Sequence, residues 1–510
     1  MKSGLRQSMA ALHTWSGLMV CWVMLLVMSC GTASYYKDAM TVWMTPELRV
    51  AAAHQVAPAQ AAAVALRALA ERASGAPSWT VTLPTGRMPA TTIAWTVPGR
   101  TGPGGWPAVA SLLLDPASGA ALAPLRQTRG GEFFYRLHFD LHYMPALWGR
   151  WIVGAGALGM LVAIVSGIIT HKRLLQDIFT FRPGRGQRSW LDGHNLLAVL
   201  PLPYHLVVAY TGLVTLMFMY LPAAVRVVYH GDQVTYAAEM LPSAGQARPR
   251  SGRPAALIPI GPVLAAAASQ WQGQPAAAFT VDRPGDAAAT LLLTRSNGAM
   301  LSYRQPTMRF DGIDGRLLAS AGDTLPAGLR AQGVLYGLHM AHYAGPWLRA
   351  LYFLCGLAGC GMLASGALLW AVKARQRQCA SGTASAALRL VDGLNIGVIA
   401  GLPLAYATYF WANCLLPAGL EQRPQVEIAC FFWAWGAVAA LGLLAPARAT
   451  WRRLLAVAGA LFVALPVLAA ATDGNGPWSA CFGAFDLVLS LLGLGLGLAA
   501  YCLRGSGGRA

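Results

Sequence analysis

The chain has 510 residues, of which 56% are hydrophobic and 11% are charged, and its mean hydropathy is positive. Several apolar runs reach about 20 residues, enough for a helix to cross a hydrocarbon core of ~30 Å, which excludes a soluble globular enzyme. The net charge of +18 would suit a nucleic-acid-binding protein, but Lys and Arg gather in alternate loops between the apolar runs. The basic excess therefore reflects membrane topology, and nucleic acid is not an expected partner.

Eight apolar runs predict membrane-spanning helices. The ends of the last four are less sharply defined, because prolines interrupt them and the loops between them are short. The spans are expected at 14–34, 150–170, 195–221, 347–372, 394–415, 428–446, 453–471 and 480–502. The basic clusters lie at Lys2 and Arg6, at Lys172, Arg173, Arg182, Arg185 and Arg188, at Lys373, Arg375, Arg377 and Arg389, at Arg448, Arg452 and Arg453, and at Arg504 and Arg509. The positive-inside rule then predicts a multi-pass membrane protein with both termini in the cytoplasm.

The start of the chain is basic and then apolar, like a signal peptide, but CGTASYYKDAM at 30–40 is a poor cleavage site. We therefore expect an uncleaved first helix. The chain divides into a first helix at 1–34, an outside segment at 35–148, two helices with a cytoplasmic loop at 149–221, a second outside segment at 222–346, a fourth helix at 347–375 and a C-terminal four-helix extension at 376–510.

The two outside segments have similar patterns. The first contains an Ala-rich helix at 57–74 followed by the strand-like runs SWTVTLP, TTIAWTV and AVASLLLD. The second contains a helix at 260–271 followed by AAAFTV, ATLLLT and AMLSYR, with turns at Asn297-Gly298 and Asp311-Gly312. Each segment is predicted to be a small periplasmic module of α+β class.

The membrane helices also repeat. The spacing from His13 to Gly31 equals that from His194 to Gly212, and His-Tyr precedes the second and fourth spans while Ser-Gly lies near their ends. The first four spans are thus an internal duplication of helix, outside module and helix. The fold predicted from the sequence is a mainly α-helical transmembrane bundle of about eight spans with two small outside modules.

Histidines are concentrated in or beside the first four spans, and the last four spans contain none. The eight candidates are His13, His138, His142, His171, His194, His205, His339 and His342. Ionisable side chains at membrane depth are costly and tend to be functional, and imidazole is a common metal ligand and an axial ligand of haem iron. There is no CxxCH motif, which argues against covalently attached haem.

The spacing of these histidines suggests two sites. On a helix, His138 with His142 and His339 with His342 would each share a face, and the duplication would set His142 opposite His342 at the outer side of the membrane. His13 and His194 form the other symmetric pair, at the cytoplasmic side, with His171 close in level. His205 could pair with His171 or His13, and symmetry does not assign it. Two facing imidazoles are what a six-coordinate b-type haem needs, so two haems are expected.

Each histidine also has a structural interpretation. The outer pairs could be interfacial side chains, those at the inner ends of the spans could extend toward the basic loops, and His205 could form a hydrogen bond between helices. His54 and His230 are interpreted as surface residues. No catalytic residue is assigned from the sequence.

Several stretches resemble the PepSY-associated transmembrane proteins, in particular the inner-membrane ferric-siderophore reductases of Gram-negative bacteria. They are HTWSGL at 13–18, RLHFDLHY at 136–143, SGIITHKRLLQDIFTFRPGRGQRSWLDGHN at 166–195 and LPYHLVVAYTGL at 202–213, and the resemblance covers about residues 10–375. It implies PepSY-like outside domains and a b-type dihaem protein that reduces a ferric siderophore in the periplasm and releases Fe(II). The C-terminal extension matches less distinctly.

The expected function is therefore haem-dependent ferric-siderophore reduction, with electrons supplied by a cytoplasmic donor or the quinol pool. The partners would be the ferric siderophore, the electron donor and the lipid bilayer. One alternative is a siderophore or metal transporter, but the first four spans contain essentially no acidic ligands. Another is a PepSY-type membrane protein that binds or regulates a periplasmic partner, which leaves the histidines unexplained.

Overall fold

The computed structural model describes residues 3–54, 56–101, 107–122, 126–171, 182, 187–240, 243–298, 300–381, 385–472 and 483–504. Lys2, Lys172, Arg173, Arg185 and Arg509 of the sequence analysis lie outside these residues. The chain forms two compact units, which we describe separately. The membrane unit comprises Met1–Met44, Arg126–Leu216 and Pro346–Ala510, and the sheet unit comprises Thr45–Leu125 and Met217–Gly345.

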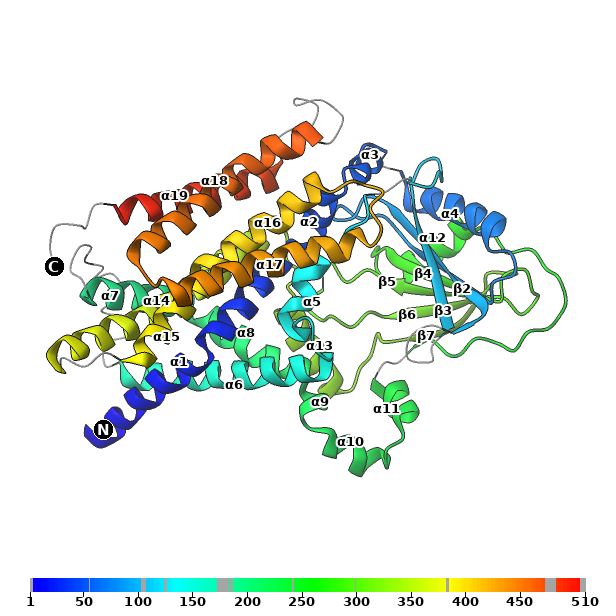
Figure 1. Ribbon diagram of the computed structural model, residues 1–510. Helices are drawn as coiled ribbons and strands as arrows, with labels where there is room; N and C mark the ends of the chain where they lie inside the picture. Colours follow the sequence, from blue (N-terminus) through cyan, green and yellow to red (C-terminus); the bar gives the residue numbers. More distant parts are fainter. Residues whose placement is uncertain are drawn as a thin grey trace. The chain divides into compact units, whose positions relative to one another are not determined.

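Seven helices of the described chain are long and apolar enough to cross a membrane, or eight if one bent pair counts as a span. They are α1 (Ser3–Ser34), α6 (Ala146–Thr170), α14 (Pro346–Ser381), α17 (Arg423–Leu444), α18 (Arg448–Thr472), α19 (Ala484–Cys502) and the continuous run of α15 (Ala386–Asn395), η2 (Ile396–Ala400) and α16 (Gly401–Leu415) (Figure 1). The bent pair is α7 (Gln187–Val199) and α8 (Leu202–Thr215), at 65°. A multi-pass helical membrane protein is thus confirmed.

Prolines account for the two irregular spans. Pro201 and Pro203 lie where α7 meets α8, and proline removes a backbone donor and clashes with the preceding turn. The predicted third span was too long at its end, because α8 ends at Thr215. The π-helical turn η2 ends three residues before Pro403, whose ring would otherwise crowd the Ile399 carbonyl.

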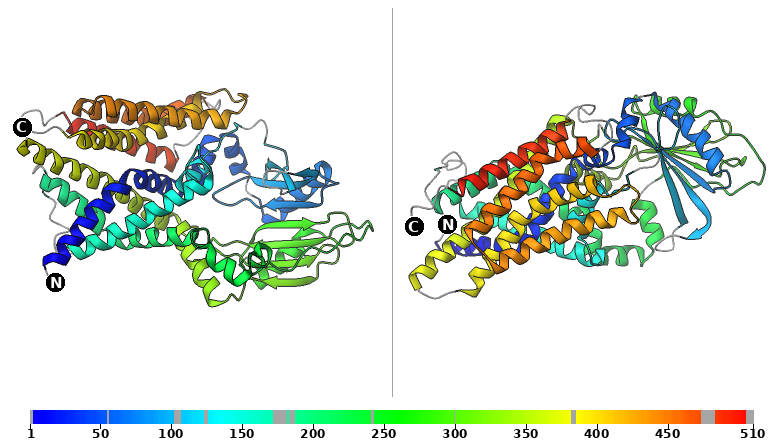
Figure 2. Two further views of the ribbon diagram at one scale, coloured as in Figure 1. Left: turned by 60° about the horizontal axis from the view of Figure 1, so that its bottom comes forward. Right: turned by 45° about the horizontal axis from the view of Figure 1, so that its top comes forward.

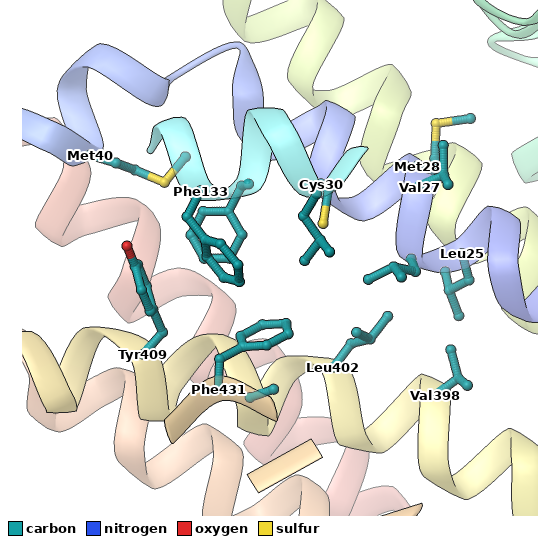
Figure 3. Packing of buried hydrophobic residues seen from close by; sticks show 14 of the residues in the cluster. Leu25, Val27, Met28, Cys30, Met40, Phe133, Val398, Leu402, Tyr409 and Phe431 are labelled. Carbon is teal, nitrogen blue, oxygen red and sulfur yellow. The ribbon is translucent and has the colours of Figure 1, made fainter. Parts of the chain in front are cut away.

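The membrane unit packs around α1, which contacts α5 (Glu132–Asp140), α6 and α14. Side chains of α1 such as Leu25 and Met28 meet Phe133 of α5 and Leu402 of α16 in one buried cluster (Figure 3). The short helix α2 (Lys37–Met44) adds Met40 to this core. In the extension, α18 and α19 approach closely because Gly459 faces Gly493, where an added Cβ would lie 2.8 Å from the opposite carbonyl oxygen.

The sheet unit contains one seven-stranded antiparallel sheet with strand order β3-β2-β1-β4-β5-β6-β7. The first outside segment supplies β1 (Ser78–Thr82), β2 (Thr91–Thr101) and β3 (Pro107–Leu114), and the second supplies β4 (Ala276–Asp282), β5 (Thr290–Arg295), β6 (Thr307–Asp311) and β7 (Leu317–Ala321). The two halves join where β1 pairs with β4, from Ser78 opposite Asp282 to Thr82 opposite Ala278. The two modules therefore share one sheet, a pairing that the sequence patterns did not predict.

The core of the sheet unit lies beneath two helices. Helices α4 (Pro58–Arg72) and α12 (Ile260–Gln270) contact each other and pack on the sheet (Figure 2). The alternation of the strands buries Val81, Ile93 and Phe279 against Leu69 of α4. Both helices lie where the sequence predicted them.

One predicted strand was wrong. Met300–Arg304 of AMLSYR lie outside the strands, and the hairpin β6–β7 follows instead, with its turn at Asp311-Gly312. The remaining helices are short: α3 (Glu47–Ala53), α9 (Met217–Tyr220), α10 (Pro222–Tyr229), α11 (Gln233–Met240) and α13 (Ala327–Met340).

Candidate functional site

His13 and His194, the symmetric pair predicted near one side of the membrane, lie together in the membrane unit. His13 is on α1 and His194 on α7, 181 positions apart, and their ring centroids are 6.2 Å apart with an interplanar angle of 67°. Metal–imidazole bonds are about 2 Å long, so two ring centres on opposite sides of one ion lie roughly 6 Å apart. The spacing of the two rings matches that of two axial ligands of one iron.

Both imidazoles are oriented by hydrogen bonds to a neighbouring helix. Nδ1 of His13 donates to the Ala163 carbonyl of α6 at 2.7 Å, and Nδ1 of His194 donates to the Met362 carbonyl of α14 at 3.0 Å. Because a carbonyl can only accept, Nδ1 of each ring carries a proton, and Nε2 is the nitrogen open to a metal. Metal-ligating histidines are held in this way, with one nitrogen donating to an acceptor and the other facing the metal.

A glycine makes room for each of these rings. An added Cβ at Gly167 would lie 3.0 Å from His13, and one at Gly366 would lie 3.2 Å from His194. Each glycine is four residues after the carbonyl that accepts the hydrogen bond, so carbonyl and glycine lie on the same helix face. The Ser-Gly pairs noted in the sequence near the ends of the second and fourth spans are these glycines.

His138 repeats this arrangement on α1. Its Nδ1 donates to the Val27 carbonyl at 2.7 Å, and an added Cβ at Gly31 would lie 2.7 Å from its ring. Burial lowers the pKa of His138, so the imidazole is held neutral, the form that binds iron. The same offset of four residues from carbonyl to glycine appears here, which makes His138 the third imidazole held against a helical glycine.

His205 of α8 is the fourth imidazole that lies against a helical glycine. Its ring is fully buried, Nε2 lies 3.4 Å from the Cys355 carbonyl of α14, and an added Cβ at Gly359 would lie 3.1 Å from it. Its Nδ1 is buried without a well-formed hydrogen bond, although the Ala198 carbonyl is near. A buried ring nitrogen that is poorly hydrogen-bonded costs free energy in the protein alone, and a bound ligand at this position would satisfy it.

The two close pairs at the outer ends of the spans do not share a helix face, contrary to the expectation from their spacing. Helix α5 ends at Asp140 and Leu141 has φ +56°, so His142 lies beyond the helix that carries His138. Helix α13 ends at Met340 and Ala341 is left-handed, so His342 lies beyond the helix that carries His339.

His142 belongs to the membrane unit and contacts the C-terminal extension. Its ring stacks on Phe432 of α17 with centroids 5.3 Å apart and an interplanar angle of 12°. Its pKa is lowered, first by burial and then by the positive charge of Arg129. His142 is therefore a neutral, aromatic-packed imidazole at physiological pH.

His339 and His342 belong to the sheet unit. Both ring nitrogens of His342 are buried without a well-formed hydrogen bond, although the Met300 and Ser302 carbonyls are near, and burial is the main cause that lowers its pKa. The His342 carbonyl accepts a hydrogen bond from Arg87 at 3.0 Å.

His171 is the C-cap residue of α6, where its backbone N–H donates to the Gly167 carbonyl. It is close enough to His194 for an electrostatic interaction. It thus lies beside the His13–His194 pair, as its position at the end of the second span predicted. His54 forms an ion pair with Asp115 at 2.6 Å in the sheet unit and has no part in this site.

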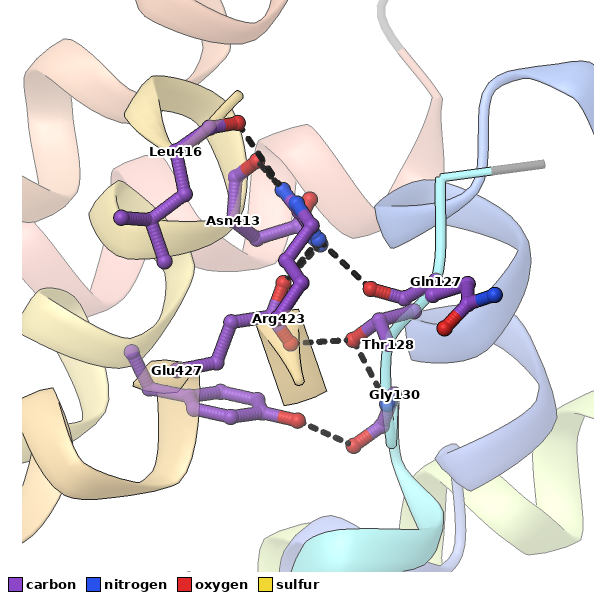
Figure 4. Close-up of polar contacts among 8 residues, drawn as sticks. Gln127, Thr128, Gly130, Asn413, Leu416, Arg423 and Glu427 are labelled. Atoms are coloured by element: carbon purple, nitrogen blue, oxygen red, sulfur yellow. Dashed lines mark hydrogen bonds and ion pairs between the residues drawn. The ribbon is translucent and has the colours of Figure 1, made fainter. Parts of the chain in front are cut away.

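The extension fixes the segment that bears His138 and His142, a contact that no sequence pattern indicates. Buried Arg423 and Glu427 of α17 form an ion pair; Arg423 donates to the Gln127 carbonyl at 2.7 Å and Thr128 donates to Glu427 at 2.6 Å (Figure 4). Tyr409 donates to the Gly130 carbonyl at 3.1 Å. We call these residues the Arg423 cluster. Its members Gln127, Thr128 and Gly130 immediately precede α5, so the cluster holds the start of this helix.

Aromatic rings continue this contact along α5. Phe134 stacks on Tyr406 with centroids 4.4 Å apart, and Phe133 packs against Tyr409 and Phe431. The run FFY at 133–135 and the aromatic residues of α16 and α17 are visible in the sequence, but nothing there indicates that they meet.

The donor set favours a planar cofactor over a bare metal ion. Among the residues that the structure describes, no group of three or more His, Cys, Asp or Glu side chains could hold a metal ion. The His13–His194 pair offers two ligands, and a haem supplies the other four from its own ring nitrogens. The residues present therefore fit a haem better than a chelated ion.

Comparisons with known proteins support the PepSY-associated part of the resemblance noted in the sequence. Residues 10–373 match the family described as the PepSY-associated TM region. The chain is also 30% identical over 352 residues to the uncharacterized protein PA4219 of Pseudomonas aeruginosa, an alignment that covers 65% of this chain and 83% of that protein. The family match contains the duplicated helices and their histidines, and it ends before the extension. The chain belongs to the PepSY-associated TM family.

Proposed function

We propose that this membrane protein is a b-type dihaem reductase that passes electrons across the bacterial inner membrane to a ferric siderophore in the periplasm. The observation that carries the proposal is the His13–His194 pair, two imidazoles from the two repeats at the spacing of axial ligands. When bound, haem would supply a one-electron carrier whose potential depends on its axial ligands and their hydrogen bonds.

In this proposal the chain's own residues fix the ligands before the cofactor binds. The Ala163 and Met362 carbonyls hold the protons of the two rings on Nδ1, and Gly167 and Gly366 allow the rings to lie against their helices. Such orientation lowers the entropy lost when the ligands bind the iron and increases the basicity of Nε2.

His138 and His205 are the best-oriented candidates for the second haem, with His142, His339 and His342 as the further candidates from the sequence. The carbonyls that His205 and His194 approach, Cys355 and Met362, are seven residues apart on α14, or ~10 Å along the helix axis. A second site at the level of His205 would therefore be nearer to the first than one at the far ends of the spans.

The sheet unit would provide the docking surface for the siderophore. Reduction suits this substrate because the hard oxygen donors of siderophores hold Fe(II) much less tightly than Fe(III). Both termini would be cytoplasmic, and the electron donor would be a cytoplasmic reductant or the quinol pool.

The test is the optical spectrum of the purified full chain. A red preparation whose Soret band shifts with dithionite, and shifts back when ferric siderophore is added, is the expected result. Right-side-out vesicles should then reduce an impermeant ferric siderophore, and inverted vesicles should not. A colourless protein from cells supplied with haem would overturn the proposal.

A further inference from the structure

A cavity of about 520 Å³ lies in the membrane unit between the duplicated helices and the C-terminal extension. α1, α2 and α14 form one side, and η2, α16, α18 and α19 form the other. Most of its lining is aliphatic or aromatic, including Leu25, Phe353, Leu402, Phe462 and Leu489. A cavity of this size and chemistry is typical of a site for an apolar ligand.

The cavity has one charged lining residue among the described part of the chain, Arg349. The hydroxyls of Ser29 and Thr32 donate to carbonyls of their own helix, so they offer little to a ligand. The Arg349 guanidinium lies 4.7 Å from the centroid of the Tyr36 ring, and its Nε is buried without a hydrogen-bond partner. An acceptor from a bound molecule would satisfy this nitrogen.

Arg349 lies at the level of a membrane interface. It is the fourth residue of α14, and its neighbour Trp347 is 89% exposed, as expected for an aromatic residue among lipid headgroups. Along α14 the lining extends from Arg349 to Ala364, ~22 Å at the helical rise. The acyl chains of one leaflet reach ~15 Å into the bilayer, so an apolar tail fits below a headgroup at Arg349.

The cavity is separate from the histidines. On α14 it is lined by Phe353, Leu357, Cys360 and Ala364, whereas His205 and His194 lie against Gly359 and Gly366. At 3.6 residues per turn these two sets occupy opposite faces of the helix. A ligand in the cavity would not compete with one at the histidines.

We propose that this cavity binds a phospholipid, with an acyl chain between α14 and the extension and the phosphate on Arg349. A guanidinium binds a phosphate through charge-assisted hydrogen bonds, so Arg349 suits a lipid headgroup. A quinol fits less well, because its oxidation releases protons and the described lining contains no carboxylate or imidazole to accept them. The bound lipid would join the extension to the duplicated helices.

The test is native mass spectrometry of the full chain after delipidation in detergent, titrated with phosphatidylglycerol or with decylubiquinone. One variant removes the charge, Arg349→Gln, with Arg452→Gln at the first turn of α18, outside the lining, as its control. A second fills the cavity, Ala364→Phe, with Val467→Phe on the exposed side of α18 as its control. Thermal unfolding without added lipid checks that each variant is folded.

We expect one phosphatidylglycerol per chain, bound ~10-fold or more weakly by Arg349→Gln, because a charge-assisted hydrogen bond is lost. Ala364→Phe should also bind it more weakly, and both control variants should bind as the wild type does. Equal lipid binding by all folded variants would overturn the proposal. So would tighter binding of decylubiquinone than of phosphatidylglycerol at this site.

Discussion

The duplicated helices and the C-terminal extension are both apolar bundles, but they use their polar residues differently. In the duplicated part, four imidazoles lie against helical glycines and near helix carbonyls. In the extension, which has no histidine, buried Arg423 and Glu427 form an ion pair and Asn413 donates to Glu427. The first arrangement presents imidazole nitrogens, which are metal ligands, and the second is centred on an ion pair within the protein.

In the proposed function, the duplicated part carries the chemistry and the extension supports it. The Arg423 cluster and the aromatic rings of α16 and α17 hold the segment that bears His138 and His142. The comparison gives four predictions, in order of decreasing expected effect.

The largest effect is expected from breaking the buried ion pair of the extension. Arg423→Met should destabilise the membrane unit by ~3–5 kcal/mol, because it leaves Glu427 buried without its charge partner. The double variant Arg423→Met/Glu427→Met should recover most of this loss. Unfolding in mixed detergent measures the effect, with Arg452→Met as the control; a single variant as stable as the wild type would show that the cluster is not an anchor.

Larger side chains in place of the glycines beside His13 and His194 should displace these imidazoles without unfolding the protein. Gly167→Leu and Gly366→Leu would push His13 and His194 from their positions, so haem retention should fall ~10-fold or more. Gly17→Leu, where nothing lies within 4 Å of an added Cβ, is the matched control. Haem content after gel filtration is the measurement, and equal retention in all three variants would contradict the role given to these glycines.

A smaller effect is expected where the extension contacts His142. Phe432→Ala removes the stacked ring and should cost ~0.5–1.5 kcal/mol beyond the loss of buried area. Trp433→Ala, at a side chain that is 79% exposed, is the control. Thermal unfolding of the two variants gives their difference in stability. Equal melting temperatures would show that the contact between His142 and Phe432 does not stabilise the protein.

The smallest effect concerns the sheet unit in acid. Hydrogen bonds from Ser251, Gly252 and Ala288 lower the pKa of Asp286, and a lowered folded-state pKa contributes stability above the unfolded value that is lost as the pH falls. Stability should therefore decline below about pH 4, and Asp286→Asn should decline less steeply. Tryptophan fluorescence of the full chain measures this loss of stability as a function of pH. Identical pH profiles for the wild type and Asp286→Asn would show that other carboxyl groups cause the decline.

The sequence predicted much of the fold because its signals are local. The length of the apolar runs predicted the spans, and the alternation of apolar and polar residues predicted most strands. The internal duplication predicted that His13 pairs with His194. The sequence did not predict that the helices end shortly after His138 and His339. A non-glycine residue with a left-handed backbone, such as Ala341, cannot be recognised from its residue type. The β1–β4 pairing and the Arg423 cluster join residues about 200 and 300 positions apart, and no local pattern reports such contacts.

The most direct measurement of the central claim is the haem content per chain of His13→Ala, His194→Ala and the double variant. If the two imidazoles hold one iron, each single variant loses one of the two haems and the double variant loses no more. His230→Asn serves as the control, because Asn tolerates the left-handed backbone at this position. Full haem content in either single variant, or loss of both haems only in the double variant, would show that His13 and His194 do not share an iron.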